Sequence, residues 1–71
     1  MVKLIGSERC DGCKALENLL RSKKVEFTKL SIDDTEVREY LISEKIFTIP
    51  VLITDKGRAI GFDPEKVEEI L

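Results

Sequence analysis

Cys10 and Cys13 are the only cysteines of the 71-residue chain, and they stand where one sequence pattern gives way to another. Before them, residues 2–5 form a short aliphatic and β-branched run ended by Gly6, which is typical of a central strand buried on both faces. After them, three leucines recur at helical spacing and predict an amphipathic helix over about residues 11–23. The pair therefore restricts this part of the chain to a strand, a short loop and a helix that begins at the cysteines.

Two further segments continue the alternation of strand and helix. Residues 25–30 begin with Val25 and Phe27 in alternation with Glu26 and Thr28, which is the period of a half-exposed strand. Asp33, followed three residues later by Glu36, resembles a capping box and predicts a second helix that ends near Lys45. Because strand–helix–strand crossovers are almost always right-handed, the first two strands should be parallel, with the first helix over one face of the sheet.

The last third of the chain predicts a hairpin and a final helix. Pro50 leads the strand of residues 51–54, a position where proline costs no ladder hydrogen bond. A turn at residues 55–57 then returns the chain as a strand over residues 58–61. The final helix has the clearest start, because Asp63 is a preferred N-cap and a proline follows it. The predicted order of elements is β-α-β-α-β-β-α.

Composition sets the class of protein. The 42% hydrophobic content of so short a chain supports one core, so we expect a single α/β domain over residues 1–71, with the aromatic side chains Phe27, Tyr40 and Phe47 inside it. The 12 basic residues are dispersed among 14 acidic ones, which excludes a basic stripe for nucleic acid. No apolar run approaches the ~20 residues of a membrane-spanning helix, and residues 1–7 are too few for a secretory signal. We therefore expect a cytoplasmic protein without a membrane partner.

The chemistry of the cysteine pair follows from its position. A C-x-x-C pair at a strand-to-helix junction supports thiol–disulfide exchange. Cys10 falls at or near the N-cap, where free N–H groups and the helix dipole favour a thiolate, so it is the expected nucleophile. Cys13 should face inward and act as the resolving thiol. Asp11 disfavours a thiolate beside it, which predicts a comparatively reducing centre, and Gly12 leaves room for the backbone of a partner.

Four other interpretations of the pair stay open. The cysteines would be half of a zinc or iron–sulfur site only if a second chain supplied the rest, because this chain has two cysteines and no histidine. They would otherwise form an inert surface disulfide or be two unrelated core residues. The fourth interpretation is a redox-inert domain that binds partners in a groove beside Pro50. We expect no bound metal and no bound cofactor.

Over essentially its full length, the chain resembles the glutaredoxin branch of the thioredoxin superfamily. The resemblance rests on the cysteine pair and on two other segments. Residues 48–51, Thr-Ile-Pro-Val, look like the family's T-x-P-x signature, and residues 60–64, Ile-Gly-Phe-Asp-Pro, stand where its hairpin meets the last helix. The resemblance implies a minimal thioredoxin fold, in which a four-stranded mixed sheet of order 2-1-3-4 carries three helices. It also implies a cis peptide bond before Pro50 and a backbone at Ile49 that pairs with the substrate.

Two departures from the family bear on the reductant. Glutaredoxins commonly have proline and an aromatic residue where this chain has Asp11 and Gly12, and a second glycine where it has Phe62. Both differences argue against tight glutathione binding. The Gly-Phe-x-Pro stretch is instead similar to small redoxins that supply electrons to ribonucleotide reductase and are recharged by thioredoxin reductase. We therefore expect a monomer that acts on a disulfide-containing protein. Its expected electron donor is thioredoxin reductase or glutathione. The resemblance implies substrate contacts at Arg9, Asp11, Gly12, Thr48, Ile49, Pro50, Gly61, Phe62 and Asp63.

Overall fold

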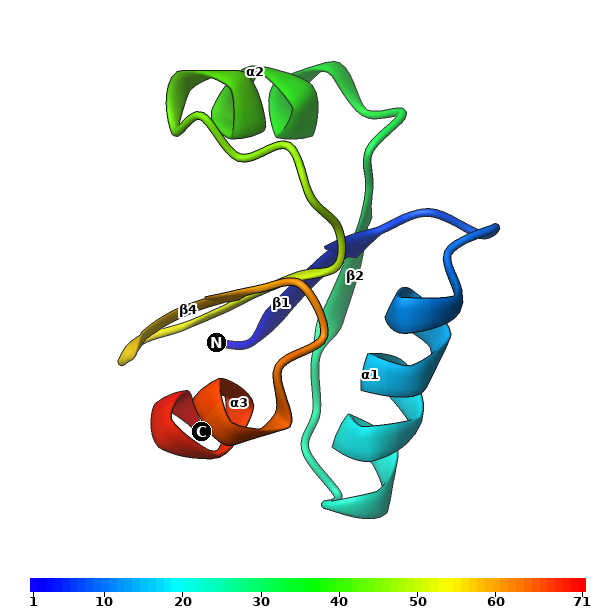
Figure 1. The fold of residues 1–71 in the computed structure, drawn as a ribbon, viewed down its shortest axis with the longest axis vertical. Coiled ribbons are helices and arrows are strands. Elements are labelled where there is room, and N and C mark those ends of the chain that lie inside the picture. Colours follow the sequence, from blue (N-terminus) through cyan, green and yellow to red (C-terminus); the bar gives the residue numbers. More distant parts are fainter.

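The computed structural model describes residues 1–71 and contains four strands and three helices in the predicted order (Figure 1). No helix is both long enough and apolar enough to cross a membrane. The elements are β1 (Lys3–Gly6), α1 (Asp11–Ser22), β2 (Thr28–Ser31), α2 (Thr35–Ser43), β3 (Val51–Thr54), β4 (Gly57–Ile60) and α3 (Pro64–Ile70).

The four strands form one mixed sheet of order β2-β1-β3-β4, which confirms the predicted topology. β1 pairs in parallel with β2, so that Ile5 lies opposite Leu30, and antiparallel with β3, where Ile5 lies opposite Val51. The β3–β4 hairpin closes the antiparallel side of the sheet. In Figure 1, α1 and α3 lie on one face of the sheet and α2 lies on the other.

Neighbouring side chains of β1 belong to two separate cores, as expected for a central strand whose side chains alternate between faces. Leu4 packs with residues of α1 and α3, and Ile5 packs with residues of α2 on the opposite face. Both side chains are only 2% exposed. The first core contains Leu4, Leu16, Leu20, Leu52, Ala59, Val67 and Ile70; the second contains Ile5, Val37, Leu41, Ile46 and Val51.

β2 begins at Thr28 and is therefore shorter than the sequence pattern predicts. The N–H of Val25 donates to the carbonyl of Leu20 and so belongs to the end of α1. The first bond from this segment towards the central strand is donated by the N–H of Thr28 to the carbonyl of Val2, which immediately precedes β1. Val25 and Phe27 pack against the first core without entering the ladder, so their alternation marks burial and not strand pairing.

The N-cap of α2 is Asp34, so the prediction that Asp33 caps this helix is wrong. Asp34 Oδ1 accepts hydrogen bonds from the N–H groups of Glu36 and Val37, at 2.9 and 3.4 Å. The Asp33 carboxylate instead lies 3.5 Å from the guanidinium of Arg38. Two adjacent aspartates offer two capping positions, and the one nearer the helix is used because a capping oxygen must reach the second or third helical N–H.

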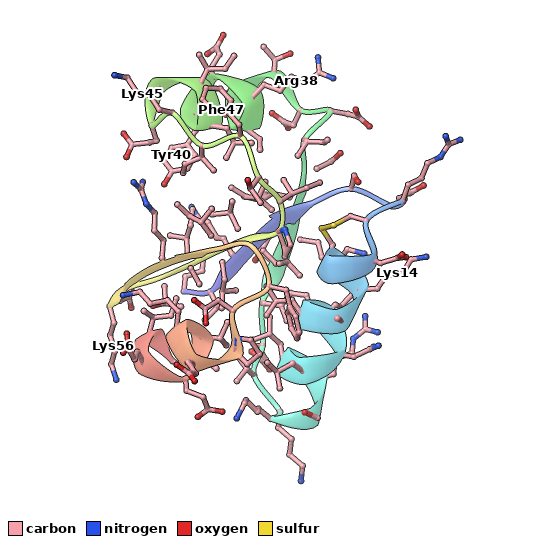
Figure 2. All side chains as sticks on the ribbon, viewed as in Figure 1. Lys14, Arg38, Tyr40, Lys45, Phe47 and Lys56 are labelled. Carbon is pink, nitrogen blue, oxygen red and sulfur yellow. A yellow bond between two sulfur atoms is a disulfide. The ribbon has the colours of Figure 1, made fainter.

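Phe47 does not enter the core, which contradicts the sequence prediction (Figure 2). Lys45 has a positive φ of 57°, which turns the chain after α2, and Ile46 takes the buried position at 5% exposure. Phe47 follows on the opposite side of the chain and is 83% exposed. Tyr40 is half-buried, and its hydroxyl accepts a hydrogen bond from Arg58.

A contact between α2 and β4 is centred on Arg58. Its Nη1 lies 2.6 Å from the carboxylate of Glu44 and 3.3 Å from the hydroxyl of Tyr40. The bond to Glu44, followed by the bond to Tyr40, raises the pKa of the Arg58 guanidinium above its ordinary value. This polar contact joins the end of α2 to the hairpin at the surface of the second core.

Candidate active site

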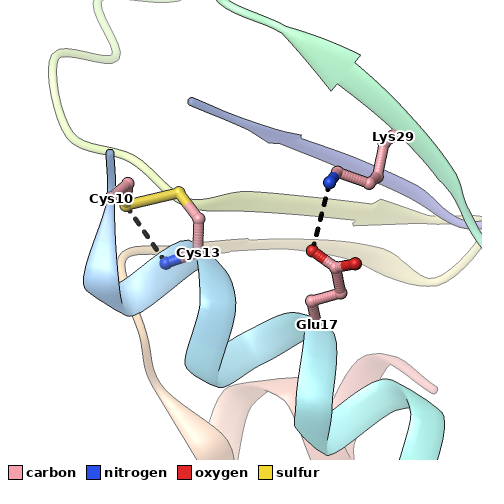
Figure 3. The surroundings of a disulfide bond; sticks show 4 residues. All are labelled: Cys10, Cys13, Glu17 and Lys29. Carbon is pink, nitrogen blue, oxygen red and sulfur yellow. Dashed lines mark hydrogen bonds and ion pairs between the residues drawn. A yellow bond between two sulfur atoms is a disulfide. The ribbon is translucent and has the colours of Figure 1, made fainter. Parts of the chain in front are cut away.

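Cys10 is the N-cap of α1, as the sequence predicts (Figure 3). Its backbone is extended, and its Sγ accepts a hydrogen bond from the N–H of Cys13 at 3.1 Å. The sulfur thus takes the place of the oxygen that normally satisfies a free helical N–H. Cys10 and Cys13 are joined by a disulfide, with their Cα atoms 5.1 Å apart.

The two sulfurs differ in exposure. Cys13 is 5% exposed and shares the inward face of α1 with Leu16 and Leu20, whereas Cys10 is only half-buried. Gly6, at the end of β1, lets Cys13 approach the sheet, because a Cβ on Gly6 would lie 2.5 Å from the Cys13 sulfur. Cys10 is therefore the sulfur that another molecule can reach.

One side of the cysteine pair is formed by Pro50 and the residues that pack beside it. The Ile49–Pro50 peptide bond is cis, as the resemblance implies, and Pro50 is buried. A Cβ on Gly12 would lie 3.3 Å from Pro50 Cδ and 3.7 Å from Phe62 Cβ, so three distant segments meet here. The N–H of Gly61 donates to the carbonyl of Pro50 at 2.7 Å and holds the hairpin end against this segment.

The remaining predicted contact residues lie in different surroundings. Thr48 is exposed beside Gly61, at 3.7 Å from the position of a Cβ there, and so belongs to the Pro50 side. Asp63 caps α3, where its Oδ1 accepts the N–H of Lys66 at 3.2 Å. Arg9 is exposed and lines a cavity that Pro50 does not reach. Asp11 is exposed in the first turn of α1.

The cavity beside Arg9 was not predicted from the sequence. It has a volume of about 720 Å³, lies between the start of α1 and β2, and has Cys13 in its wall. Glu17 also lines it, and its side chain is only 15% exposed. The carboxylate contacts Lys29 at 3.3 Å (Figure 3) and, in addition, Arg21 at 2.6 Å. The signal in the sequence is the spacing of Cys13 and Glu17, because residues four apart share one face of a helix.

The structure has no group of three or more histidine, cysteine, aspartate or glutamate side chains placed to hold a metal ion. Cys10 and Cys13 are the only thiols of the chain. A site with four thiolate ligands would therefore take two ligands from a second chain.

This sheet order, the disulfide-bonded cysteine pair at the start of the first helix and the sequence match reported next together define a disulfide oxidoreductase. A sequence profile described as glutaredoxin matches residues 2–59, and the chain belongs to the glutaredoxin family.

The chain is similar to three other proteins of this kind. An uncharacterized glutaredoxin-like 8.6 kDa protein in the rubredoxin operon of Clostridium pasteurianum is 27% identical over 100% of this chain and 97% of the relative. The glutaredoxin-like protein NrdH-redoxin from Escherichia coli has a TM-score of 0.90 at 20% identity, with 99% of this chain and 93% of the other covered. A glutaredoxin from Archaeoglobus fulgidus has a TM-score of 0.77 at 26% identity, with 97% and 83% covered.

Proposed function

We propose that this protein reduces disulfide bonds in other proteins, with Cys10 as the nucleophile and Cys13 as the resolving thiol. The observation that carries the assignment is the asymmetry of the pair. Cys10 Sγ accepts a helical N–H and is half-exposed, whereas Cys13 is buried behind it. A free N–H and the positive end of a helix dipole both stabilise negative charge on sulfur, so the accessible cysteine is also the one that ionises more readily.

The proposed cycle has two exchange steps. The Cys10 thiolate attacks one sulfur of the substrate disulfide, forms a mixed disulfide and releases the other substrate sulfur as a thiolate, which takes a proton. Cys13 then loses its proton, attacks Cys10 and releases the second substrate thiol. The substrate disulfide is thereby reduced, and the Cys10–Cys13 disulfide seen here is the oxidised product. A separate dithiol or thiol must reduce it again.

The Pro50 side of the pair is the proposed site for the substrate backbone. Ile49 is half-buried and precedes Pro50, whose ring lies beside Gly12. Because Gly12 has no side chain, it does not obstruct an extended segment that pairs with the Ile49 backbone. Phe62 is 45% exposed next to Gly12 and supplies apolar surface at the edge of this site. A protein segment in extended conformation fits these features.

We infer a thioredoxin-reductase-type enzyme as the preferred electron donor, with glutathione as the alternative. The carboxylate of Asp11 is exposed beside the cysteines and repels the net negative charge of glutathione. The Asp63 carboxylate, one of the substrate contacts that the resemblance implies, is already engaged as the cap of α3. The centre is complete within one chain, which supports a monomer. Structural disulfides are rare in the reducing cytoplasm, whereas catalytic cysteine pairs do occur there, so we propose that the protein acts in that compartment.

The test supplies purified protein with NADPH and either thioredoxin reductase or glutathione plus glutathione reductase, with a protein disulfide as acceptor. We expect faster turnover with thioredoxin reductase, no turnover for Cys10→Ser, and a trapped mixed disulfide for Cys13→Ser. Full activity of Cys10→Ser would contradict the proposal. Absorbance and metal analysis of freshly purified protein tests the alternative in which two chains share a metal or cluster, since a stoichiometric metal would replace the redox proposal.

A further inference from the structure

Glu17 is a carboxylate held largely out of solvent near the resolving cysteine. It follows Cys13 by four residues, a spacing that puts Cβ atoms about 5–6 Å apart on one helix face. Its side chain is 15% exposed although it carries a charge, and Lys29 from β2 and Arg21 from α1 both contact it. Figure 3 shows the carboxylate turned towards Lys29, on the side of α1 that faces β2.

The resolving step requires a proton to leave Cys13 at a moment when the bound substrate covers the route past Cys10. In the mixed disulfide the substrate lies over Cys10, and Cys13 itself is only 5% exposed. The cavity of about 720 Å³ reaches Cys13 from the β2 side, and Glu17 lies in the same wall. This volume is ample for water, which needs only about 10–15 Å³ and polar partners.

We infer that Glu17 is the first acceptor of the Cys13 proton, through one water in this cavity; the inference rests on the proposed function. The water gives a proton to the Glu17 carboxylate and takes the thiol proton of Cys13. The resulting thiolate attacks Cys10, a bond forms between the two cysteine sulfurs, and the bond to the substrate sulfur breaks. That sulfur leaves as a thiolate and is protonated by solvent, and Glu17 returns its proton to solvent.

The charges around the cavity allow this role. A lone carboxylate would disfavour a thiolate nearby, but Lys29 and Arg21 offset the charge of Glu17. The cavity wall as a whole carries three acidic and three basic side chains. Asp33 also lines the cavity and pairs with Arg38 at 3.5 Å, but it belongs to the loop after β2 and not to the helix face that carries Cys13. The charged residues of the wall are Glu8, Arg9, Lys14, Glu17, Lys29 and Asp33.

The size of the effect is bounded by thiol chemistry. Positioned general bases accelerate reactions by about 10²–10⁴-fold. A free thiol with an ordinary pKa of about 8.5 is already about 3% ionised at pH 7, which limits the gain there to roughly 30-fold. We therefore expect loss of Glu17 to slow the resolving step about tenfold at pH 7.

The experiment separates the two exchange steps by stopped flow. Reduced protein reacts with excess dithiodipyridine, a neutral disulfide, and each step releases one absorbing pyridinethione. The first release reports attack by Cys10 and the second reports resolution by Cys13. For Glu17→Gln we expect the first phase to stay within about twofold of the native rate and the second to fall about tenfold at pH 7. Glu39→Gln is the matched control, because it removes one carboxylate from an exposed position on α2.

Two readouts distinguish proton transfer from loss of structure. Added formate should restore most of the second-phase rate of Glu17→Ala and leave the native rate unchanged, because the cavity admits a small carboxylate. The native second phase should also be slower in D₂O, and this measurement needs no variant. A native-like second phase in Glu17→Gln, failure of formate rescue in a folded variant, or no slowing in D₂O would overturn the inference. Absence of the first phase in the native protein would instead overturn the proposed function.

Discussion

Replacement of Gly6 by alanine should destabilise the oxidised protein through one defined collision. The new Cβ would lie 2.5 Å from Cys13 Sγ and 3.0 Å from Cys13 Cβ. Neither atom moves easily, because Cys13 is buried, belongs to α1 and is tied to Cys10, while Gly6 ends the central strand of the sheet. Relief therefore requires a shift between α1 and β1.

The expected magnitude combines two opposing effects. Inserting a methyl group into a packed site costs about 1–3 kcal/mol, whereas alanine restricts the unfolded chain and returns about 0.4–1 kcal/mol. Near the middle of both ranges, the free energy of unfolding should thus fall by about 1–2 kcal/mol. For a domain of this size that loss lowers Tm by about 4–16 °C, at about 4–8 °C per kcal/mol.

Urea denaturation and thermal unfolding of the oxidised protein measure this change, with Gly12→Ala as the matched control. A Cβ on Gly12 would lie 3.3 Å from Pro50 Cδ, which is a much milder contact than the 2.5 Å at Gly6. Alanine also suits a helix better than glycine by about 0.5–1 kcal/mol. We expect Gly12→Ala to be neutral or slightly stabilising. If Gly6→Ala unfolded at the same urea concentration as the native protein, a side chain at position 6 would not collide with Cys13, and the reasoning would be refuted.

Three further predictions concern the active site and the surface. Asp11→Asn removes the carboxylate beside Cys10 and should shift the pH profile of Cys10 alkylation to lower pH, and an unchanged profile would show that Asp11 does not influence the thiolate. In urea, Asp34→Ala should lose about 1 kcal/mol of unfolding free energy, because two N–H groups of α2 lose their acceptor, and a native-like midpoint would contradict the cap assignment. Phe47→Ser should change that free energy by less than about 0.5 kcal/mol, since the ring is 83% exposed, and a larger loss would mean that it packs in solution.

Local patterns were sufficient for most of the fold. Leu16 and Leu20 lie on the buried face of α1 as their spacing predicts, and Leu4 and Ile5 are buried on both faces of the sheet. The pattern was insufficient at Phe47, since either member of an adjacent Ile-Phe pair can face a core. The positive φ of Lys45 decides between them, and lysine is not a residue that signals such a conformation.

The candidate site also has one part that local sequence predicts and one part that it does not. The N-cap position of Cys10 is local and was predictable, because it depends on a strand, a short loop and a helix in sequence. The surroundings of Glu17 depend on Lys29, which reaches the helix only because β2 pairs in parallel with β1. Spacing along α1 identifies the face that Cys13 and Glu17 share, but only the pairing of strands shows what else lines it.

The position of β1 between two cores has a consequence for repeated turnover. Its side chains anchor it on both faces, so we expect its amide hydrogens to exchange with solvent only when the whole protein unfolds. The cysteine pair follows this anchored strand after a short loop, beyond the carboxyl end of β1 and outside the ladder. Each cycle can therefore break and remake a covalent bond beyond the end of this strand while the framework that positions the two sulfurs keeps its shape.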